Sequence, residues 1–250
     1  MPEGPSIVIL KEEVQPFKGK KVIKVEGNSK IGIERLQGQK VIDFKSWGKQ
    51  FLICFKDFTV RIHLLMFGSY RINERKDTVP RLSLQFKNGE LNFYTCSVKF
   101  IEEDLDTVYD WEADVMSDSW NLQKAVQKLK ALKNTPVCDV LLDQQVFAGS
   151  GNIIKNEVLF RLRLHPETLV EALSPAQMKQ LAVETRNYSF DFYNWKKKFE
   201  LRKHWQVYKQ KNCPNCGTKI TLQHLGKHKR RTFFCNQCQV YKEKKQKIKV

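Results

Sequence analysis

Four cysteines near the end of the chain have the spacing of a metal site. They form the pairs C-P-N-C and C-N-Q-C with 18 residues between them: Cys213, Cys216, Cys235 and Cys238. This spacing is typical of a zinc ion held by four thiolates, in which each pair occupies one edge of a tetrahedron. Because sulfur would fill every coordination position, we expect one structural Zn²⁺. Unrelated thiols and disulfides are the alternatives, and an intracellular chain keeps its thiols reduced.

The start of the chain could supply a nucleophile. Pro2 follows Met1, and a small second residue permits removal of the initiator methionine, which would leave a secondary amine. Because α-amino groups titrate at about 7.7–8.0, a useful fraction is neutral at physiological pH. Attack on a sugar C1′ would give an iminium, and the adjacent Glu3 could protonate the ring oxygen or relay protons. Most chains that begin Met-Pro-Glu make no chemical use of their termini.

A glycine-rich turn could bind an anion. Residues 147–152 read F-A-G-S-G-N, between a predicted helix that ends near Val146 and another that starts near Asn152. Glycines there would allow a tight turn with free backbone amides, and Asn152 could cap the second helix. Such a turn fits a phosphate, although a plain connection between two helices is more frequent.

The elements that must position these residues follow from periodicity. Apolar residues Ile7, Leu10 and Val14 predict a short helix over residues 5–15. Short strands are then predicted over residues 20–27, 39–47, 50–55, 59–66, 81–86 and 91–97. The dipeptide Asn88-Gly89 predicts a two-residue hairpin turn between the last two strands. Dense short strands with polar turns indicate a β-sandwich.

Past Trp111 the pattern becomes helical. Helices are predicted over residues 121–132, 138–147, 153–162 and 175–195. The sequence therefore predicts an α+β chain of three parts: a β-sandwich with a leading helix at 1–116, a helical domain at 117–205, and a zinc finger with a basic tail at 206–250. The remaining three cysteines lie in apolar settings and are expected to be buried: Cys54, Cys96 and Cys138.

Positive charge is concentrated at one end. The 250 residues include 44 Lys and Arg against 27 Asp and Glu, a net charge of +17, and 17 of the basic but only 2 of the acidic residues lie between Lys196 and Val250. This distribution indicates a polyanionic partner, although a Lys-rich tail can also serve solubility alone. No stretch approaches the roughly 18 apolar residues of a membrane span, and acidic residues near the N-terminus are atypical of a secretory signal. We therefore expect neither a membrane protein nor a secreted one.

Together these features resemble one family. The start Met-Pro-Glu-Gly-Pro, Gly48-Lys49 before a strand, the A-G-S-G-N turn and the four-cysteine finger are similar to the formamidopyrimidine-DNA glycosylase/endonuclease VIII family over nearly the whole chain. The resemblance implies a helix–two-turn–helix fold for the helical domain. It also implies base-excision repair, in which a bifunctional enzyme removes an oxidised base from damaged double-stranded DNA and cleaves the strand by β,δ-elimination. The damaged nucleotide would be flipped out, because its C1′ is inaccessible inside a duplex.

The resemblance also assigns roles to residues. Pro2 would be the nucleophile, Glu3 the acid and base, and Lys49 the lysine that grips phosphate beside the lesion, with an ordinary strand-edge lysine as the alternative. Five further residues match phosphate-holding positions: His63, Asn152, Tyr208, Arg230 and, if the register shifts by one, Arg231. Such contacts position DNA without reading its sequence.

A flipped base leaves a void, which the apolar run Leu65, Met66 and Phe67 could fill; ordinary core packing is the alternative. The guanine-lesion branch takes part of its wedge from a Pro-Arg-Arg-Phe run, where this chain reads Y-T-C-S-V-K-F at residues 94–100. The segment 198–208 is also short for a lesion-capping loop. The chain is therefore more similar to the endonuclease VIII branch, and oxidised pyrimidines are the favoured substrates.

Two residues depart from the family pattern. Ser6 stands where the family usually has a second glutamate, and Ser150 replaces a branched apolar residue. The alternative function is a non-catalytic damaged-DNA-binding protein on the same scaffold, which would not need a free Pro2. A simple zinc-ribbon module would leave the β-rich half unexplained. We expect a monomer that works in the cytoplasm, at the bacterial nucleoid.

Overall fold

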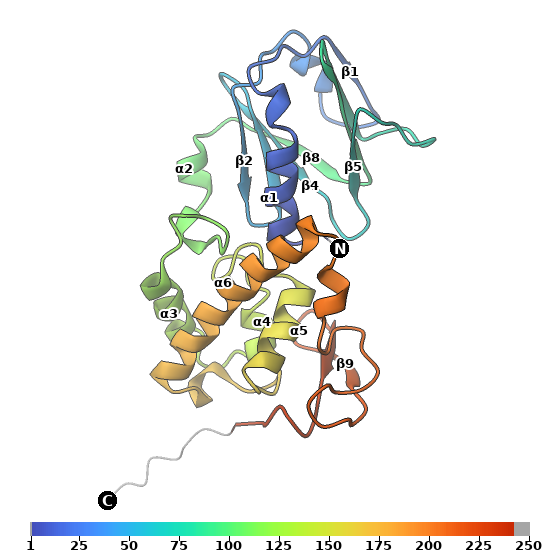
Figure 1. Cartoon of the computed structure of the whole chain (residues 1–250). Helices are drawn as coiled ribbons and strands as arrows, with labels where there is room; N and C mark the ends of the chain where they lie inside the picture. Colours follow the sequence, from blue (N-terminus) through green and yellow to red (C-terminus); the bar gives the residue numbers. More distant parts are fainter. Residues whose placement is uncertain (1, 243–250) are drawn as a thin grey trace, which may run out of the picture. The chain divides into compact units, whose positions relative to one another are not determined.

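The computed structural model describes residues 2–242, which divide into two compact units between Asp110 and Trp111. We refer to them as the N-terminal unit and the C-terminal unit (Figure 1). The N-terminal unit is built on two antiparallel sheets, and the C-terminal unit joins helices to a hairpin that carries the four-cysteine cluster. The predicted fold class is confirmed. The predicted domain boundaries at residues 116 and 205 stay predictions.

Each sheet of the N-terminal unit has four strands. The first has the order β2-β3-β4-β8, with bounds Asp43–Trp47, Gln50–Cys54, Thr59–His63 and Ser97–Ile101. The second has the order β1-β6-β7-β5, with bounds Lys24–Glu26, Leu82–Phe86, Gly89–Tyr94 and Ser69–Ile72. Short helix α2, Leu105–Val108, follows the last strand.

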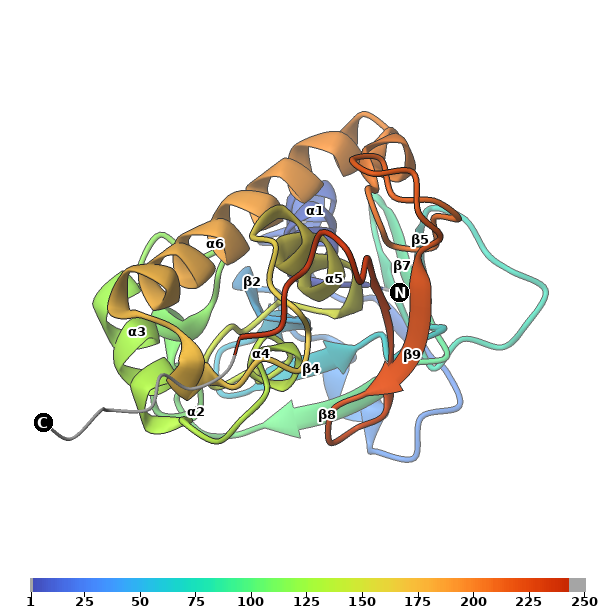
Figure 2. The same ribbon diagram turned by 90° about the horizontal axis from the view of Figure 1, so that it is seen from below.

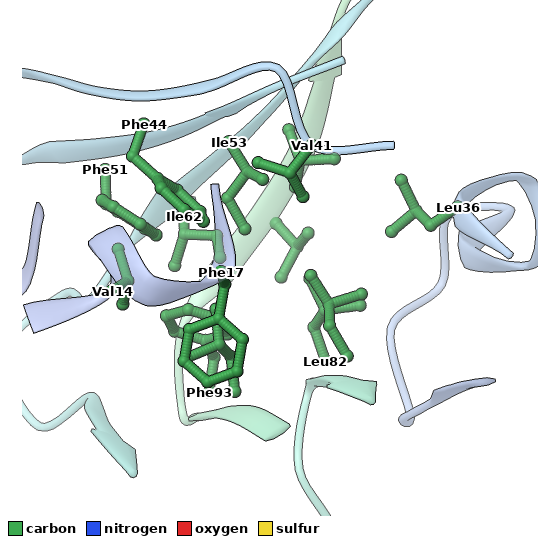
Figure 3. Packing of buried hydrophobic residues seen from close by; sticks show 14 of the residues in the cluster. Val14, Phe17, Leu36, Val41, Phe44, Phe51, Ile53, Ile62, Leu82 and Phe93 are labelled. Atoms are coloured by element: carbon green, nitrogen blue, oxygen red, sulfur yellow. The ribbon is translucent and has the colours of Figure 1, made fainter. Parts of the chain in front are cut away.

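Apolar side chains from both sheets, several of them aromatic, form the core of the N-terminal unit. Figure 3 shows Phe44 and Phe51 of the first sheet near Phe93 of the second. The ring centroids of Phe51 and Phe93 lie 5.9 Å apart, and those of Phe44 and Phe51 lie 5.7 Å apart. Alternate strand residues point to the same face of a sheet, so the apolar set of each strand meets the other sheet.

The predicted N-terminal helix is confirmed as α1, Gly4–Glu13. It contacts β2 and β3, and its residues Ile7 and Leu10, with Val14 just beyond its end, are buried in the same core. The packing of this face on the sheet therefore fixes where the start of the helix lies.

The C-terminal unit is built around one buried helix. Its helices are α3 Leu122–Ala131, α4 Val137–Val140, α5 Asn152–Arg161 and α6 Pro175–Lys197, and its hairpin strands are β9 Thr221–Leu225 and β10 Arg230–Phe234. Every residue of α5 from Asn152 to Phe160 is buried. Long helix α6 contacts α3 and α5, and β10 contacts α5 (Figures 1 and 2). Helix α6 begins with a capping box, in which the side chains of Ser174 and Gln177 each accept a hydrogen bond from the other residue's backbone N–H.

Several strand predictions need correction. The strand predicted over 59–66 ends at His63, because Leu65 takes a left-handed φ of 52°. The stretch 91–97 contains most of β7 and the first residue of β8, and β5 was not predicted. In the β6–β7 hairpin Phe86 pairs with Gly89, so the two turn residues are Lys87 and Asn88 and not Asn88-Gly89.

The helix predicted over 138–147 is also wrong. Helix α4 ends at Val140, and the next residues form successive turns in which Val146 N and Phe147 N both donate to the Asp143 carbonyl. The Asp143 carboxylate accepts a hydrogen bond from Gln145 N at 2.8 Å, a local side-chain contact that competes with the helix.

None of the helices within residues 2–242 combines the length and the hydropathy that a membrane crossing needs. Most of the predicted basic tail, residues 243–250, lies outside the described residues.

Candidate functional site

The start of α1 presents a buried carboxyl group. Glu3 is fully buried at the N-cap of α1, and Pro2 beside it is partly buried. Ser6 N donates to the Glu3 carbonyl at 2.8 Å, which makes Ser6 the third residue of the helix. Ser6 exposes 7% of its surface, and its buried hydroxyl has no hydrogen-bond partner among the described residues. A glutamate here would reach back to the N-cap backbone, as in a capping box, whereas a serine is too short.

The predicted phosphate ligands Lys49 and His63 lie at one end of the first sheet. Lys49 occupies the two-residue turn between β2 and β3, and Gln50 after it pairs with His63. Burial lowers the pKa of His63, and the positive charges of Lys49 and Arg61 lower it further. His63 is thus neutral at pH 7, and its Nδ1 accepts a hydrogen bond from Leu65 N at 3.3 Å. In Figure 1 the start of α1 and the turn after β2 lie at the same end of this unit.

The three predicted wedge residues follow directly after His63. Leu65, Met66 and Phe67 expose 49%, 48% and 80% of their surface. Core packing, the alternative for this run, predicts burial and is therefore wrong for these side chains. The loop is tightly closed, since Gly68 N donates to the Leu64 carbonyl at 2.7 Å.

The connection between β7 and β8, which lies in the segment used above to distinguish the two branches of the family, is very short. Strand β7 ends at Tyr94 and β8 begins at Ser97, so only Thr95 and Cys96 connect the two sheets here. Cys96 is buried, and Thr95 has a left-handed φ of 50°. Two residues leave no room for a second wedge loop at this turn.

The four predicted metal ligands come together. Their Sγ atoms all lie within 4.8 Å of one another, with 3.4 Å between Cys216 and Cys235 and 3.7 Å between Cys213 and Cys238. Zinc–sulfur bonds of about 2.3 Å in a tetrahedron place sulfur atoms about 3.8 Å apart, so this donor set fits a four-thiolate metal site. Gln239 supports it, because its Oε1 accepts from Cys235 N and its Nε2 donates to the Leu164 carbonyl, both at 2.9 Å.

The turn before α5 differs from the prediction. Gly149 N donates to Gln144 Oε1 at 3.1 Å, and Ser150 N donates to a carbonyl three residues earlier, so neither amide is free. Gly151 is the N-cap of α5 and Asn152 its first residue, so Asn152 is not the cap. Two buried polar atoms at this helix start have no partner among the described residues, Ser150 Oγ and Asn152 Oδ1.

Instead of capping, Asn152 helps to hold the hairpin. Three side chains of α5 bond consecutive residues of β10: Asn152 Nδ2 to the Arg231 carbonyl (2.8 Å), Lys155 Nζ to the Thr232 hydroxyl (2.7 Å), and Asn156 Oδ1 from Phe233 N (2.9 Å). Arg230 and Arg231 are exposed at the start of β10, whereas the residues after them are buried. The helix therefore fixes the strand and leaves both arginine side chains at the surface.

Tyr208 is placed by the same helix. The Glu157 carboxylate accepts three backbone hydrogen bonds, from Gln206 N at 2.9 Å, Val207 N at 3.1 Å and Tyr208 N at 2.8 Å. Burial raises the pKa of Glu157, and these three donors oppose that shift. The Tyr208 ring packs edge-on against Phe233, with centroids 5.2 Å apart.

Sequence reasoning missed this set of supporting residues. Lys155, Asn156 and Glu157 form a polar triplet between two apolar stretches of α5, and all three are buried. Buried polar groups need partners. Three consecutive polar residues between apolar stretches of a predicted buried helix were therefore a usable signal that another segment docks on that helix.

Two domain models of one glycosylase family match this chain, one in each unit. The formamidopyrimidine-DNA glycosylase N-terminal domain matches residues 1–100, and the H2TH domain of the same glycosylase matches residues 112–188. The chain belongs to the formamidopyrimidine-DNA glycosylase/endonuclease VIII family. Within it, the chain is similar to endonuclease 8-like proteins.

Two curated relatives illustrate this similarity. Endonuclease 8-like 3 of Xenopus laevis is 35% identical over 242 residues, which cover 92% of this chain and 39% of that protein. Endonuclease 8-like 2 of Homo sapiens is 32% identical over 197 residues, which cover 72% of this chain and 57% of that protein. The chain thus spans about two fifths of the first relative and somewhat more than half of the second.

Solved structures share the fold. A viral DNA glycosylase superposes with a TM-score of 0.83 at 19% identity, covering 95% of this chain and 100% of that one. Lactococcus lactis formamidopyrimidine-DNA glycosylase, in a non-covalent complex with DNA containing an AP site, gives 0.83 at 22% identity and covers 95% and 99%.

Proposed function

We propose that this chain is a bifunctional DNA glycosylase and AP lyase that removes oxidised bases, with pyrimidines favoured. The observation on which this rests is the family's N-terminal Pro-Glu pair with the Glu3 carboxyl fully buried on α1. Base excision of this kind needs an amine nucleophile with an acid and base beside it, and Pro2, once Met1 is removed, together with Glu3 would supply both groups. The two-residue connection between β7 and β8 supports the pyrimidine preference.

In the proposed reaction the Pro2 nitrogen, freed by removal of Met1, attacks C1′ of the damaged nucleotide. The C1′–N bond to the base breaks, and the base leaves with a proton. The C1′–O4′ ring bond then breaks, its oxygen takes a proton, and an iminium remains between Pro2 and the opened sugar. Glu3 donates and accepts the protons of these steps. Elimination at the two neighbouring phosphates then cuts the strand, and water releases Pro2.

We assign the DNA contacts as follows. Lys49 holds phosphate from the β2–β3 turn, neutral His63 donates one hydrogen bond, and Leu65 to Phe67 fill the void. From the C-terminal unit, Arg230 and Arg231 supply charge, and Asn152 uses its second amide hydrogen. Tyr208 is a further phosphate contact, and the four cysteines hold one structural Zn²⁺. The location that goes with this activity is the cytoplasm, at the DNA, and a monomer suffices.

Borohydride trapping on a duplex with one abasic site tests the proposal. Untagged protein with Met1 removed, as verified by mass spectrometry, is expected to form a covalent adduct at Pro2. The variant Pro2→Gly, in which a primary amine replaces the secondary one, is expected to keep its affinity for the duplex and to lose most base removal. DNA binding without any adduct from the processed wild type would favour a non-catalytic damaged-DNA-binding protein.

A further inference from the structure

The tip of the β9–β10 hairpin is hydrogen-bonded to a single carboxylate, that of Asp139. Lys227 N donates to both oxygens of Asp139, at 3.1 Å to Oδ1 and 2.9 Å to Oδ2. Asp139 lies in α4, which is 88 residues away in the chain and precedes the turn before α5. Hydrogen bonds to an ionised acceptor are roughly twice as strong as neutral ones, so this is a strong attachment for a loop.

The backbone approaches Asp139 so closely that only glycine fits next to Lys227. Gly226 has a φ of 75°, and a Cβ placed on it would lie 2.1 Å from Asp139 Oδ1 and 2.8 Å from Cγ. The turn closes with a hydrogen bond of 3.0 Å from Lys229 N to the Gly226 carbonyl. Glycine at position 226 thus allows both the left-handed backbone of the turn and the close approach of the Asp139 carboxylate.

The tip of the hairpin and the start of β10 are strongly basic. Residues 227–231 read K-H-K-R-R, and all five are exposed. Like charges along a short loop repel one another, and a loop held only at its base would spread. Pairing with β9 and the hydrogen bond from Asn152 of α5 hold this run at Arg230 and Arg231, and Asp139 adds a hold on Lys227 in the turn itself.

We propose that Asp139 is a positioning residue for DNA binding: it holds the hairpin tip so that the basic run 227–231 contacts phosphate as one preorganised surface. This rests on the proposed DNA-binding function. Electrostatics alone predicts the opposite effect of removing Asp139, because loss of an acid from a basic surface should strengthen binding to a polyanion. The sign of the change therefore separates positioning from charge.

The test compares four variants by DNA affinity at several salt concentrations. Asp139→Ala removes charge and contact, and it is expected to weaken binding about tenfold and to flatten the salt slope by about 1, as for a lost phosphate contact. Asp139→Asn removes the charge but keeps an acceptor oxygen for Lys227 N, and it should bind as tightly as wild type or more tightly. Glu167→Ala, a matched loss of an exposed acid in the same unit, should not weaken binding.

A structural readout accompanies these affinities. Hydrogen exchange of the Lys227 amide should be slow in wild type and fast in Asp139→Ala, with thermal unfolding nearly unchanged. If Asp139→Ala unfolds, Gly226→Ala provides the second route, because its Cβ displaces the tip from an intact Asp139.

The fourth variant, Arg230→Ala, separates the two proposals. Weaker binding by Arg230→Ala together with wild-type or tighter binding by Asp139→Ala would overturn the positioning role while leaving the hairpin as a DNA contact. Wild-type affinity in both variants would overturn the hairpin's proposed DNA contact as well.

Discussion

Replacement of Phe67 by alanine should impair base removal from a duplex without destabilising the protein. Phe67 exposes 80% of its surface, so its truncation removes few contacts within the N-terminal unit. We expect the free energy of unfolding to change by no more than about 0.5 kcal/mol. Leu65 and Met66 beside it are half exposed, and the loop geometry depends on backbone bonds that the substitution leaves intact.

The loss of activity follows from the surface that Phe67 would bury in the DNA stack. Full burial of a phenylalanine side chain stabilises by about 1.5–3 kcal/mol. Since one fifth of Phe67 is already covered, insertion gains about four fifths of this, or about 1.2–2.4 kcal/mol. If the flipped state resembles the transition state, kcat/KM on a damaged duplex should fall by roughly 8- to 60-fold.

The assay is single-lesion base release, measured on a duplex and on the same strand unpaired. The unpaired strand has no stack to restore, so Phe67→Ala should act on it almost as fast as wild type. Val79→Ala is the matched control, because Val79 is 67% exposed in the same unit and outside the wedge. Equal loss on both substrates, or no loss on the duplex, would refute the wedge assignment.

Two further predictions concern the C-terminal unit and the cysteines. With a zinc chelator at pH 7.5, maleimide should label the four cluster thiols, whereas Cys96 and Cys138 should stay unlabelled, because burial raises their pKa values to about 11 and 12. Labelling of Cys138 before global unfolding, read by mass spectrometry, would contradict this. Burial raises the pKa of Glu157 above its ordinary value of 4.5, because ionisation costs more in the folded state than in the unfolded one. The free energy of unfolding should therefore fall as the pH rises from about 4.5 through the raised pKa. Urea titrations of Glu157→Gln should lack this component, and an identical pH dependence in both proteins would disprove it.

Local sequence signals predicted the elements that depend on local chemistry. The helix α1, the strands with clear alternation and the four-cysteine cluster were all predicted, because side-chain periodicity and C-x2-C spacing act over a few residues. Two of the errors arose where a local side-chain bond or a left-handed residue ended an element early. Asp143 ended one helix, and Leu65 ended one strand.

Tertiary structure decided what the polar residues do. From the sequence, Asn152 suggests a helix cap, and core packing is the alternative to a wedge for Leu65 to Phe67. In the fold, Asn152 instead binds the Arg231 carbonyl of β10, and the apolar run is exposed. The tip of the hairpin meets Asp139 across 88 residues of chain. No local pattern encodes such a contact, because a buried or docked polar group selects its partner only after packing has brought distant segments together.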